Sequence, residues 1–328
     1  MFQPEFHFLT RRKSFGTQRG MTLTELMVAM VIGILLIGSV IFAFITSFFS
    51  FRTNDNLARL QESGRIAINM LERDLRNIGY TGGCGIPGGF SSSTALLEKV
   101  EQGIWKTSSA PNSASMELLT MRDGLISLTG DATAGNPGTV PVNSLVEKND
   151  LVFIGDCGKG EIFEVQSVDL AALEIKGRLT SGYPFNAAGP NVDVISWESV
   201  QYMHNAALKT LKRCRNDAVD CSKDSNDEGV LTDNVEVFRV CVADHTGSNR
   251  QRNGNYITLS SAPSSTDSYW KRVAFIQVDL VISSPGGSGE HERSPSLPLC
   301  GNGDSFDPPD NRLYKLFSTT VALRNRLL

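Results

Sequence analysis

The sequence Arg19-Gly20-Met21-Thr22-Leu23-Thr24-Glu25-Leu26 leads into a long uncharged segment, and the architecture of the chain follows from this junction. From Leu26 to Phe51 there are 26 residues without a charge, and sixteen of them are Leu, Ile, Val or Phe. A helix of this length spans roughly 39 Å, more than the bilayer core of about 30 Å. The sixteen apolar side chains favour insertion by roughly 5–10 kcal/mol, which outweighs the cost of about 3 kcal/mol for the carboxylate of Glu25. The segment is therefore predicted to cross a membrane as a helix.

The residues on either side of this segment predict its orientation and exclude two simpler interpretations. Four basic residues between positions 11 and 19 precede it, which keeps the N-terminus cytoplasmic and sends the rest of the chain outward. A secretory signal peptide has an apolar core of about 7–15 residues that ends at an A-x-A-like site, and neither feature is present here. A plain signal anchor leaves Glu25 unexplained, because a lone carboxylate at the membrane, five residues past Gly20, is costly without a partner.

Residues 19–26, together with the apolar helix that follows them, resemble the class III leader of type IV prepilins. In that family a prepilin peptidase cuts after the glycine and methylates the new N-terminus, and the fifth mature residue is Glu. The resemblance implies cleavage between Gly20 and Met21 and assigns an assembly role to Glu25. Met21 departs from the Phe that the family has more often at the first mature position. Residues 1–20 are then a cleaved leader, and residues 21–51 are the transmembrane and assembly half of the helix.

An amphipathic pattern continues the helix beyond the membrane, over residues 52–79. Its apolar members recur at helical spacing, at Leu57, Leu60, Ala67, Leu71, Leu75 and Ile78. Asp74 is an exception near the edge of this stripe, and no proline interrupts residues 21–79. Six glycines and a proline between positions 79 and 89 end the helix. The G-x-G-x-x-G match at 83–88 is no dinucleotide site, because it closes a helix and contains a proline.

Residues 80–328 are expected to form one β-rich periplasmic or extracellular head. Strand-like runs recur at Met116–Met121, Asp150–Ile154, Glu161–Val168, Leu173–Leu179, Asp193–Trp197, Val235–Val242, Val273–Ile282 and Leu316–Leu323. Several of them alternate between apolar and polar residues, as expected for a sheet covered on one face. Stretches rich in Ser, Gly, Pro and Asn are expected as loops, at 107–114, 130–143, 181–191, 261–268 and 283–310. The predicted fold class is α+β: a long N-terminal transmembrane and amphipathic helix with a C-terminal, pilin-like head on a largely antiparallel β-sheet.

A narrower resemblance relates the head to PilW-type minor pilins. It rests on Asn77-Ile78-Gly79-Tyr80, on Gly155-Asp156-Cys157 before Ile162-Phe163-Glu164-Val165, and on later motifs at 235–240, 272–278 and 317–325. The resemblance implies a structural subunit that primes or initiates a type IV pilus, in twitching motility, adhesion or DNA uptake. It implies as partners other minor pilins, the major pilin, the prepilin peptidase and the inner-membrane assembly platform. The subunit would pass once through the inner membrane with a periplasmic head, and reach the pilus or cell surface after assembly.

Two alternatives stay open beside this interpretation. The closing stretch also resembles type II secretion pseudopilins of the J kind. A membrane-tethered periplasmic enzyme or binding protein would need a convergent polar site, and the sequence has no H-E-x-x-H, G-x-S-x-G, Walker A or C-x-x-C pattern. Neither an enzymatic activity nor a cofactor is therefore predicted. Beyond residue 20 the chain has 27 basic and 34 acidic residues, and this net charge of −7 argues against nucleic acid as a ligand.

All six cysteines follow the apolar segment, which predicts disulfides formed in an oxidising compartment; they are Cys84, Cys157, Cys214, Cys221, Cys241 and Cys300. Six cysteines allow fifteen connectivities. Cys214 and Cys221 are close enough in sequence to close one small loop. The PilW-like pattern favours Cys84 with Cys157, which leaves Cys241 for Cys300.

Acidic loop residues are candidates for calcium, which prefers hard oxygen ligands at short spacing. They are Asp217, Asp220, Asp224 and Asp227 beside Glu228, and separately Asp304, Asp307 and Asp310. Neither group matches an EF-hand, and solvated surface acids are the simpler interpretation, so no metal is assigned.

Overall fold

The computed structural model describes residues 20–79, 90–91, 96, 100, 102–108, 113–121, 126, 128–142, 146–155, 160–179, 192–215, 229–244, 256–263, 269–285, 294–301 and 303–323. The chain divides into two compact units, Met1–Arg52 and Thr53–Leu328.

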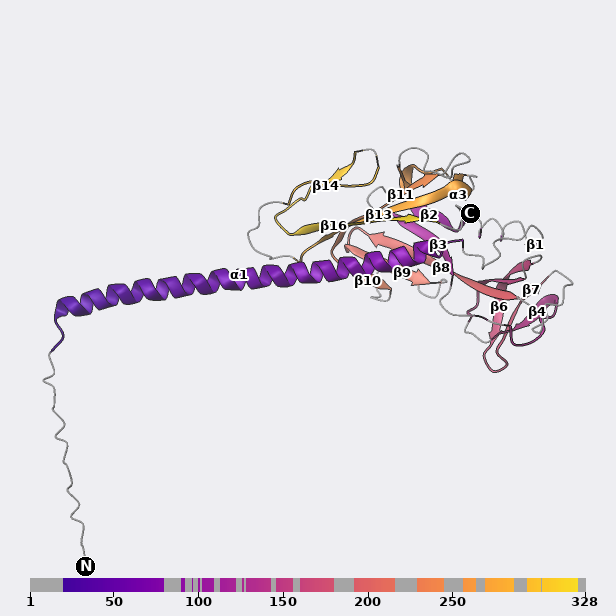
Figure 1. Ribbon diagram of the computed structural model, residues 1–328, viewed down its shortest axis with the longest axis horizontal. Helices are drawn as coiled ribbons and strands as arrows, with labels where there is room; N and C mark the ends of the chain where they lie inside the picture. Colours follow the sequence, from indigo (N-terminus) through magenta and orange to yellow (C-terminus); the bar gives the residue numbers. More distant parts are fainter. Residues whose placement is uncertain are drawn as a thin grey trace, which may run out of the picture. The chain divides into compact units, whose positions relative to one another are not determined.

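The first unit consists, in its described part, of the apolar half of helix α1, which runs from Leu23 to Arg76 and is drawn in indigo in Figure 1. An 18-residue window of this helix has a mean hydropathy of 2.9, and none of that window is buried inside the protein. The hydroxyls of Ser39 and Thr46 donate to the main-chain carbonyls of Leu36 and Phe42 within the same helix. Because polar groups in a lipid environment must be satisfied internally, these bonds fit a membrane-spanning helix.

In the second unit, one sheet of the described chain has four antiparallel strands in the order β12-β11-β13-β16. They are β12 (Ile257–Thr258), β11 (Val235–Asp244), β13 (Val273–Ser283) and β16 (Tyr314–Ala322), with the 3₁₀ turn η1 (Leu259–Ser261) and the short helix α3 (Tyr269–Arg272) between β12 and β13. A separate two-stranded pair, β14 (Leu297–Pro298) and β15 (Ser305–Phe306), lies in the connection from β13 to β16. Figure 1 shows these strands in orange and yellow.

A larger sheet of ten strands follows the order β10-β9-β8-β5-β6-β7-β4, with β1, β2 and β3 attached beside this path. Its members are β1 (Phe90–Ser91), β2 (Ile104–Ser108), β3 (Ser115–Met121), β4 (Gly135–Pro141), β5 (Leu151–Gly155), β6 (Gly160–Asp169), β7 (Glu174–Leu179), β8 (Asp193–Asn205), β9 (Thr210–Arg215) and β10 (Val230–Thr232). Only the short β1–β6 pair is parallel among the described pairings, so the sheet is largely antiparallel, as the sequence predicted.

Strand β8 joins two hydrophobic cores. Its first part, residues 193–197, pairs with β5, while residues 200–205 pair with β9 and residues 197–203 with β3. One core lies among β4 to β7. The other lies between the second half of α1 and the strands that face it; it includes Leu60, Ala67, Leu71 and Leu75 of the helix, and Ile78 two residues past the end of α1. The predicted apolar stripe up to Leu75 is therefore the buried face of the helix, with its first member, Leu57, half-buried.

All eight predicted strand runs are present, but two of the predicted loops contain strands. Strand β4 lies in 130–143 and the β14–β15 pair in 283–310, so the expectation of loops was wrong at those positions. Propensity misled the prediction for β4, since Gly and Pro are depleted in strands. Pairing with β7 makes it a strand, and a side chain on Gly138 would lie 2.5 Å from the Thr133 carbonyl, so the close approach requires glycine.

Candidate functional site

Reciprocal hydrogen bonds between Thr22 and Glu25 close the N-terminus of α1. The main-chain N–H and the hydroxyl of Thr22 each donate to Oε2 of Glu25 over 3.0 Å. In return, the N–H of Glu25 donates to the Thr22 hydroxyl over 3.3 Å. This is a capping box, in which an N-cap Thr and a Glu three residues later satisfy each other's main-chain donors. The Thr-x-x-Glu spacing is visible in the sequence, where attention to capping would have found it.

Gly20 and Met21 are the exposed residues that precede this helix. A side chain added to Gly20 would meet no atom within 4 Å. The fold of the chain therefore sets no steric requirement for glycine at position 20. A requirement for glycine at this position would then come from the peptidase that recognises the chain, as the cleavage hypothesis assumes.

The apolar half of α1 lacks a covering layer among the described residues. From Leu23 to Phe51 every residue except the half-buried Gly33 is exposed. Exposing apolar surface to water costs about 25 cal/mol per Å², so lipid or neighbouring helices are needed around this segment. The first charge after it belongs to Arg52, whose guanidinium lies over the Phe48 ring at 5.4 Å. Such a cation at the end of an apolar helix fits the membrane–water interface.

A buried polar network attaches the second half of α1 to the strands of the head. Asp74 is 2% exposed, and its Oδ2 accepts hydrogen bonds from the Tyr202 hydroxyl at 2.6 Å and from Nε of Arg213 at 2.8 Å. Arg213 also lies 3.8 Å from the buried Glu198, and the Thr120 hydroxyl donates to the main-chain carbonyl of Asp74. The polar exception in the predicted stripe is thus the point at which helix, β8, β9 and β3 are joined.

The electrostatics of this network favour a charged pair. Burial raises the pKa of Tyr202, and the negative charge of Asp74 raises it further, so the phenol stays a hydrogen-bond donor. Burial opposes the charge on Arg213, but the hydrogen bonds and electrostatic attraction that Asp74 and Tyr202 supply together outweigh this effect and hold its pKa above the usual value. The carboxylate of Asp74 is therefore satisfied by one charged donor, Arg213, and one neutral donor, Tyr202.

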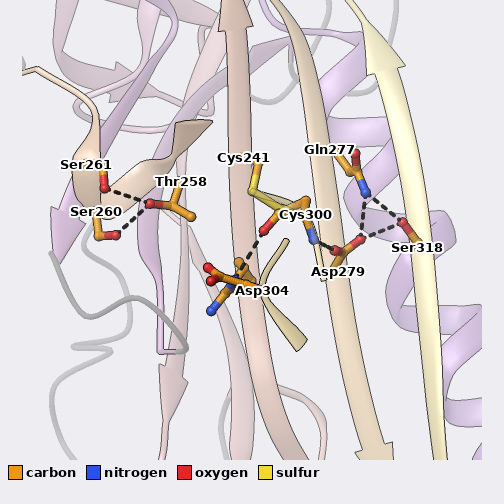
Figure 2. The surroundings of a disulfide bond; sticks show 10 residues. Cys241, Thr258, Ser260, Ser261, Gln277, Asp279, Cys300, Asp304 and Ser318 are labelled. Atoms are coloured by element: carbon orange, nitrogen blue, oxygen red, sulfur yellow. Dashed lines mark hydrogen bonds and ion pairs between the residues drawn. A yellow bond between two sulfur atoms is a disulfide. The ribbon is translucent and has the colours of Figure 1, made fainter. Parts of the chain in front are cut away.

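A disulfide between Cys241 of β11 and Cys300 fixes the segment after β14 onto the four-stranded sheet (Figure 2). This is the pairing that the PilW-like resemblance left for these two cysteines. Figure 2 also shows Asp279 of β13, which accepts a hydrogen bond from the main-chain N–H of Cys300 and another, over 2.5 Å, from the Ser318 hydroxyl. The buried Arg239 donates to the Cys300 carbonyl over 3.2 Å and pairs with Asp304 at 2.6 Å. The carboxylate of Asp304, one of the calcium candidates, is therefore paired with an arginine.

The other cysteine and calcium hypotheses fall largely outside the described residues. Cys214 is also disulfide-bonded, and its partner lies outside the described part, as do Cys84, Cys157 and Cys221. The pairings Cys84–Cys157 and Cys214–Cys221 stay predictions. The acids Asp217, Asp220, Asp224 and Asp227 lie outside it as well, and the residues that are described contain no group of three metal-binding side chains.

Two family models match the chain. The one described as Type IV Pilus-assembly protein W matches residues 200–325, from within β8 to beyond β16. The one described as Prokaryotic N-terminal methylation motif matches residues 16–47, which include Gly20, Met21, the capping box and most of the apolar segment. Strands β4 to β7 lie outside both matches. No curated protein and no solved structure matches the chain.

Proposed function

We propose that this chain, a member of the type IV pilin-like family, is a minor pilin that primes or initiates assembly of a type IV pilus. Its head would lie in the periplasm, and cleavage between Gly20 and Met21 would expose a new N-terminus at the membrane. The observation that carries the proposal is the position of Glu25, a carboxylate at the start of the apolar half of α1, where no other residue up to Phe51 is charged and nearly all are exposed. The match to a pilus-assembly family supports the pilus rather than a secretion pseudopilus.

The capping box defines what Glu25 can do before and after assembly. In the single subunit its carboxylate accepts two hydrogen bonds from Thr22, which replace part of its hydration. Both donors are neutral, so the negative charge itself is not compensated. After cleavage the nearest cation is the α-amine of Met21, in the same subunit or in a neighbour, and methylation would keep that amine positive. A neighbouring amine would pair with Glu25 at one axial register only, because a shift of one helical turn separates the charges by about 5 Å.

Substitution of Glu25 tests this role. Glu25→Gln and Glu25→Leu should leave insertion, cleavage and the fold of the head unchanged, while lowering co-purification with other pilins and the number of surface pili. Ser39→Ala is the matched control, since the Ser39 hydroxyl bonds only within its own helix in the described structure, and it should assemble normally. If Glu25→Leu assembled as efficiently as the wild type, apolar packing alone would drive assembly and the proposed role of the carboxylate would be wrong.

Cleavage is tested separately by the intact mass of the membrane-extracted protein. The measured mass should correspond to a protein that begins at Met21, with or without one added methyl group. Gly20→Leu should block processing even though the fold has room for the side chain. A mature protein that retains residues 11–19 would contradict the leader assignment. Loss of protein secretion with normal pili in a deletion strain would favour the pseudopilus alternative.

A further inference from the structure

Strand β16 is a free edge of the four-stranded sheet. It pairs with β13 over nine consecutive residues, from Tyr314 to Ala322, without a register shift. Within the described part of the chain, no strand pairs with its other side. A free edge presents a row of unpaired main-chain N–H and C=O groups, which is a template for another strand.

The hydrogen bonds at its two ends identify which groups are available. The carbonyl of Leu313 accepts from the N–H of Ser284 over 2.8 Å, and the N–H of Leu323 donates to the carbonyl of Ala274 over 2.7 Å. In an antiparallel pair, residues alternate between those bonded to the partner strand and those directed away from it. The odd-numbered residues are therefore bonded to β13, and the N–H and C=O groups of Leu316, Ser318 and Thr320 point toward the free side.

The other sheet edges in the described residues are short or interrupted. Strand β12 has two residues, and β10 has three with a register shift. Strand β4 contains two prolines and a register shift, and β2 contains a shift. Proteins use short strands, bulges and prolines to prevent unwanted pairing at edges. Strand β16 has no proline and no shift, so this edge alone, of those described, is open to regular strand addition.

Two hollows lie beside this edge, between β16 and α1. One, of about 290 Å³, is lined by Gln61, Arg65, Ile68 and Asn69 of the helix and by Lys315, Phe317 and Ser318 of the strand. The other, of about 400 Å³, is lined by Arg76 and by residues 320–322. Phe317 and Val321 face the helix, with Val321 in the core and Phe317 packed against it. Alternate side chains of an added strand would point into these hollows.

The hollows are cationic on a chain whose mature part is acidic. Their described lining includes Arg65, Arg76 and Lys315 and no acid, whereas residues beyond 20 carry a net charge of −7. Glu72 pairs with Arg76, and Lys315 lies over the Phe317 ring at 5.6 Å. Arg65, by contrast, has no ion pair within the described residues. Complementarity of charge therefore selects a strand with acidic side chains on the side that faces the helix.

We propose that β16 receives an extended segment of another pilin-family subunit as a fifth strand, with acidic side chains of that segment placed against Arg65 and Lys315. Main-chain bonds to Leu316, Ser318 and Thr320 would supply affinity, and the hollows would select the alternate side chains, as in other cases of strand addition. The identity of the occupant rests on the proposed role in pilus assembly, but the contact is distinct from the one at Glu25.

A proline at position 320 tests the edge directly in the full-length processed protein. Thr320→Pro removes an outward N–H and no bond to β13, and Thr320→Val is the matched control that keeps the N–H. Each variant is solubilised from cells that contain the pilus system, and the co-purified pilins are quantified. A photoreactive residue at position 320 then identifies the segment that is contacted. We expect at least about a tenfold loss for Thr320→Pro, from a lost hydrogen bond and a steric block, and none for Thr320→Val.

A charge-reversal pair covers the case in which Thr320→Pro unfolds the head. Arg65→Glu combined with Lys315→Glu leaves the strand intact and should lower recovery of the same partner, whereas Arg59→Glu, at an exposed helical pair with Asp55, should not. The inference would be wrong if Thr320→Pro with a folded head, or the charge-reversal pair, co-purified as much pilin as the wild type does. A cross-link from position 320 to a protein outside the pilin family, or to a segment that is not extended, would also overturn it. If Glu25→Leu stops assembly while both edge variants assemble, the proposed function stands and the edge inference fails.

Discussion

Loss of the Asp74 carboxylate should destabilise the head more than loss of an exposed ion pair does. The perturbation is Asp74→Ala, which takes the closest carboxylate away from Arg213, whose side chain is only 9% exposed, and leaves it with Glu198 at 3.8 Å. It also removes the acceptor of the Tyr202 hydroxyl. Breaking a buried ion pair from one side costs about 3–5 kcal/mol, and because Glu198 still compensates part of the charge on Arg213, we expect a cost near the lower end of this range. Asp74→Asn keeps an acceptor for Tyr202 and should cost about 1–3 kcal/mol.

The double variant Asp74→Leu with Arg213→Met separates the charge effect from packing. Replacing both members of a buried pair by apolar residues of similar size is often nearly neutral. Glu198 keeps Arg215 at 3.4 Å in this variant, but the Tyr202 hydroxyl loses both Asp74 and Arg213 as hydrogen-bond partners. We therefore expect the double variant to lie within about 3 kcal/mol of the wild type, with a coupling energy of about 2–3 kcal/mol between the two sites. Asp55→Ala, which breaks an exposed pair with Arg59, should cost about 1 kcal/mol or less.

Urea unfolding followed by tryptophan fluorescence measures these differences. Trp197 and Trp270 are fully buried in the head, so their emission reports its unfolding directly. The processed full-length protein is used in detergent, with one protein concentration and pH for all variants. An Asp74→Ala cost below about 1 kcal/mol would refute the reasoning, because the ion pair between Asp74 and Arg213 would then contribute no more than a solvent-exposed pair does. So would a double variant destabilised by the full sum of the two single changes, because the sites would then not be coupled.

Three further predictions concern the head. Cys241→Ser with Cys300→Ser should lower the free energy of unfolding by about 4 kcal/mol, because the bond closes a loop of 59 residues, and an unchanged urea midpoint would contradict this. Gly64→Ala would place its Cβ 2.2 Å from the Phe317 ring and should cost about 1–3 kcal/mol by overpacking, whereas in a Phe317→Ala background the same change should stabilise the helix by about 0.5–1 kcal/mol. Burial opposes the charge on Glu236, but hydrogen bonds from Lys209 and Ser283 and nearby Arg312 hold its pKa below the usual 4.5; its contribution is therefore present above about pH 4.5 and lost as the pH falls through the folded-state pKa. The stability difference between wild type and Glu236→Gln should accordingly shrink between pH 7 and pH 3, and a constant difference would argue against the charged pair.

The features predicted correctly from the sequence are those that depend on short contiguous stretches. The apolar segment is defined by its hydropathy and length, and the buried face of α1 by spacings of three and four. Strands such as β11 and β13 are defined by their β-branched and aromatic content. The capping box was accessible in the same way, since Thr22 and Glu25 are three residues apart, but only attention to that spacing would have found it.

Pairing between distant residues could not be predicted in this way. Asp74 looked like an exception at the edge of an apolar stripe because its partners, Tyr202 and Arg213, are 128 and 139 residues away in the chain. The low strand propensity of β4 concealed a strand that exists only because β7 supplies its hydrogen bonds.

Hydropathy, helical period and strand-like alternation were sufficient to predict a membrane-length helix, its amphipathic continuation and a β-rich head, because each of these is a sum over neighbouring residues. The open edge of β16 could not be predicted, since a strand becomes an edge only when no other strand packs beside it. The same holds for the ion pair of Asp74, whereas the pairing of Cys241 with Cys300 followed from the family resemblance rather than from the residues alone. These features depend on which remote segments come together in the folded chain: packing of α1 against β8 and β9 brings Asp74 to Tyr202 and Arg213, and pairing with β13 on one side alone makes β16 an edge among the described strands.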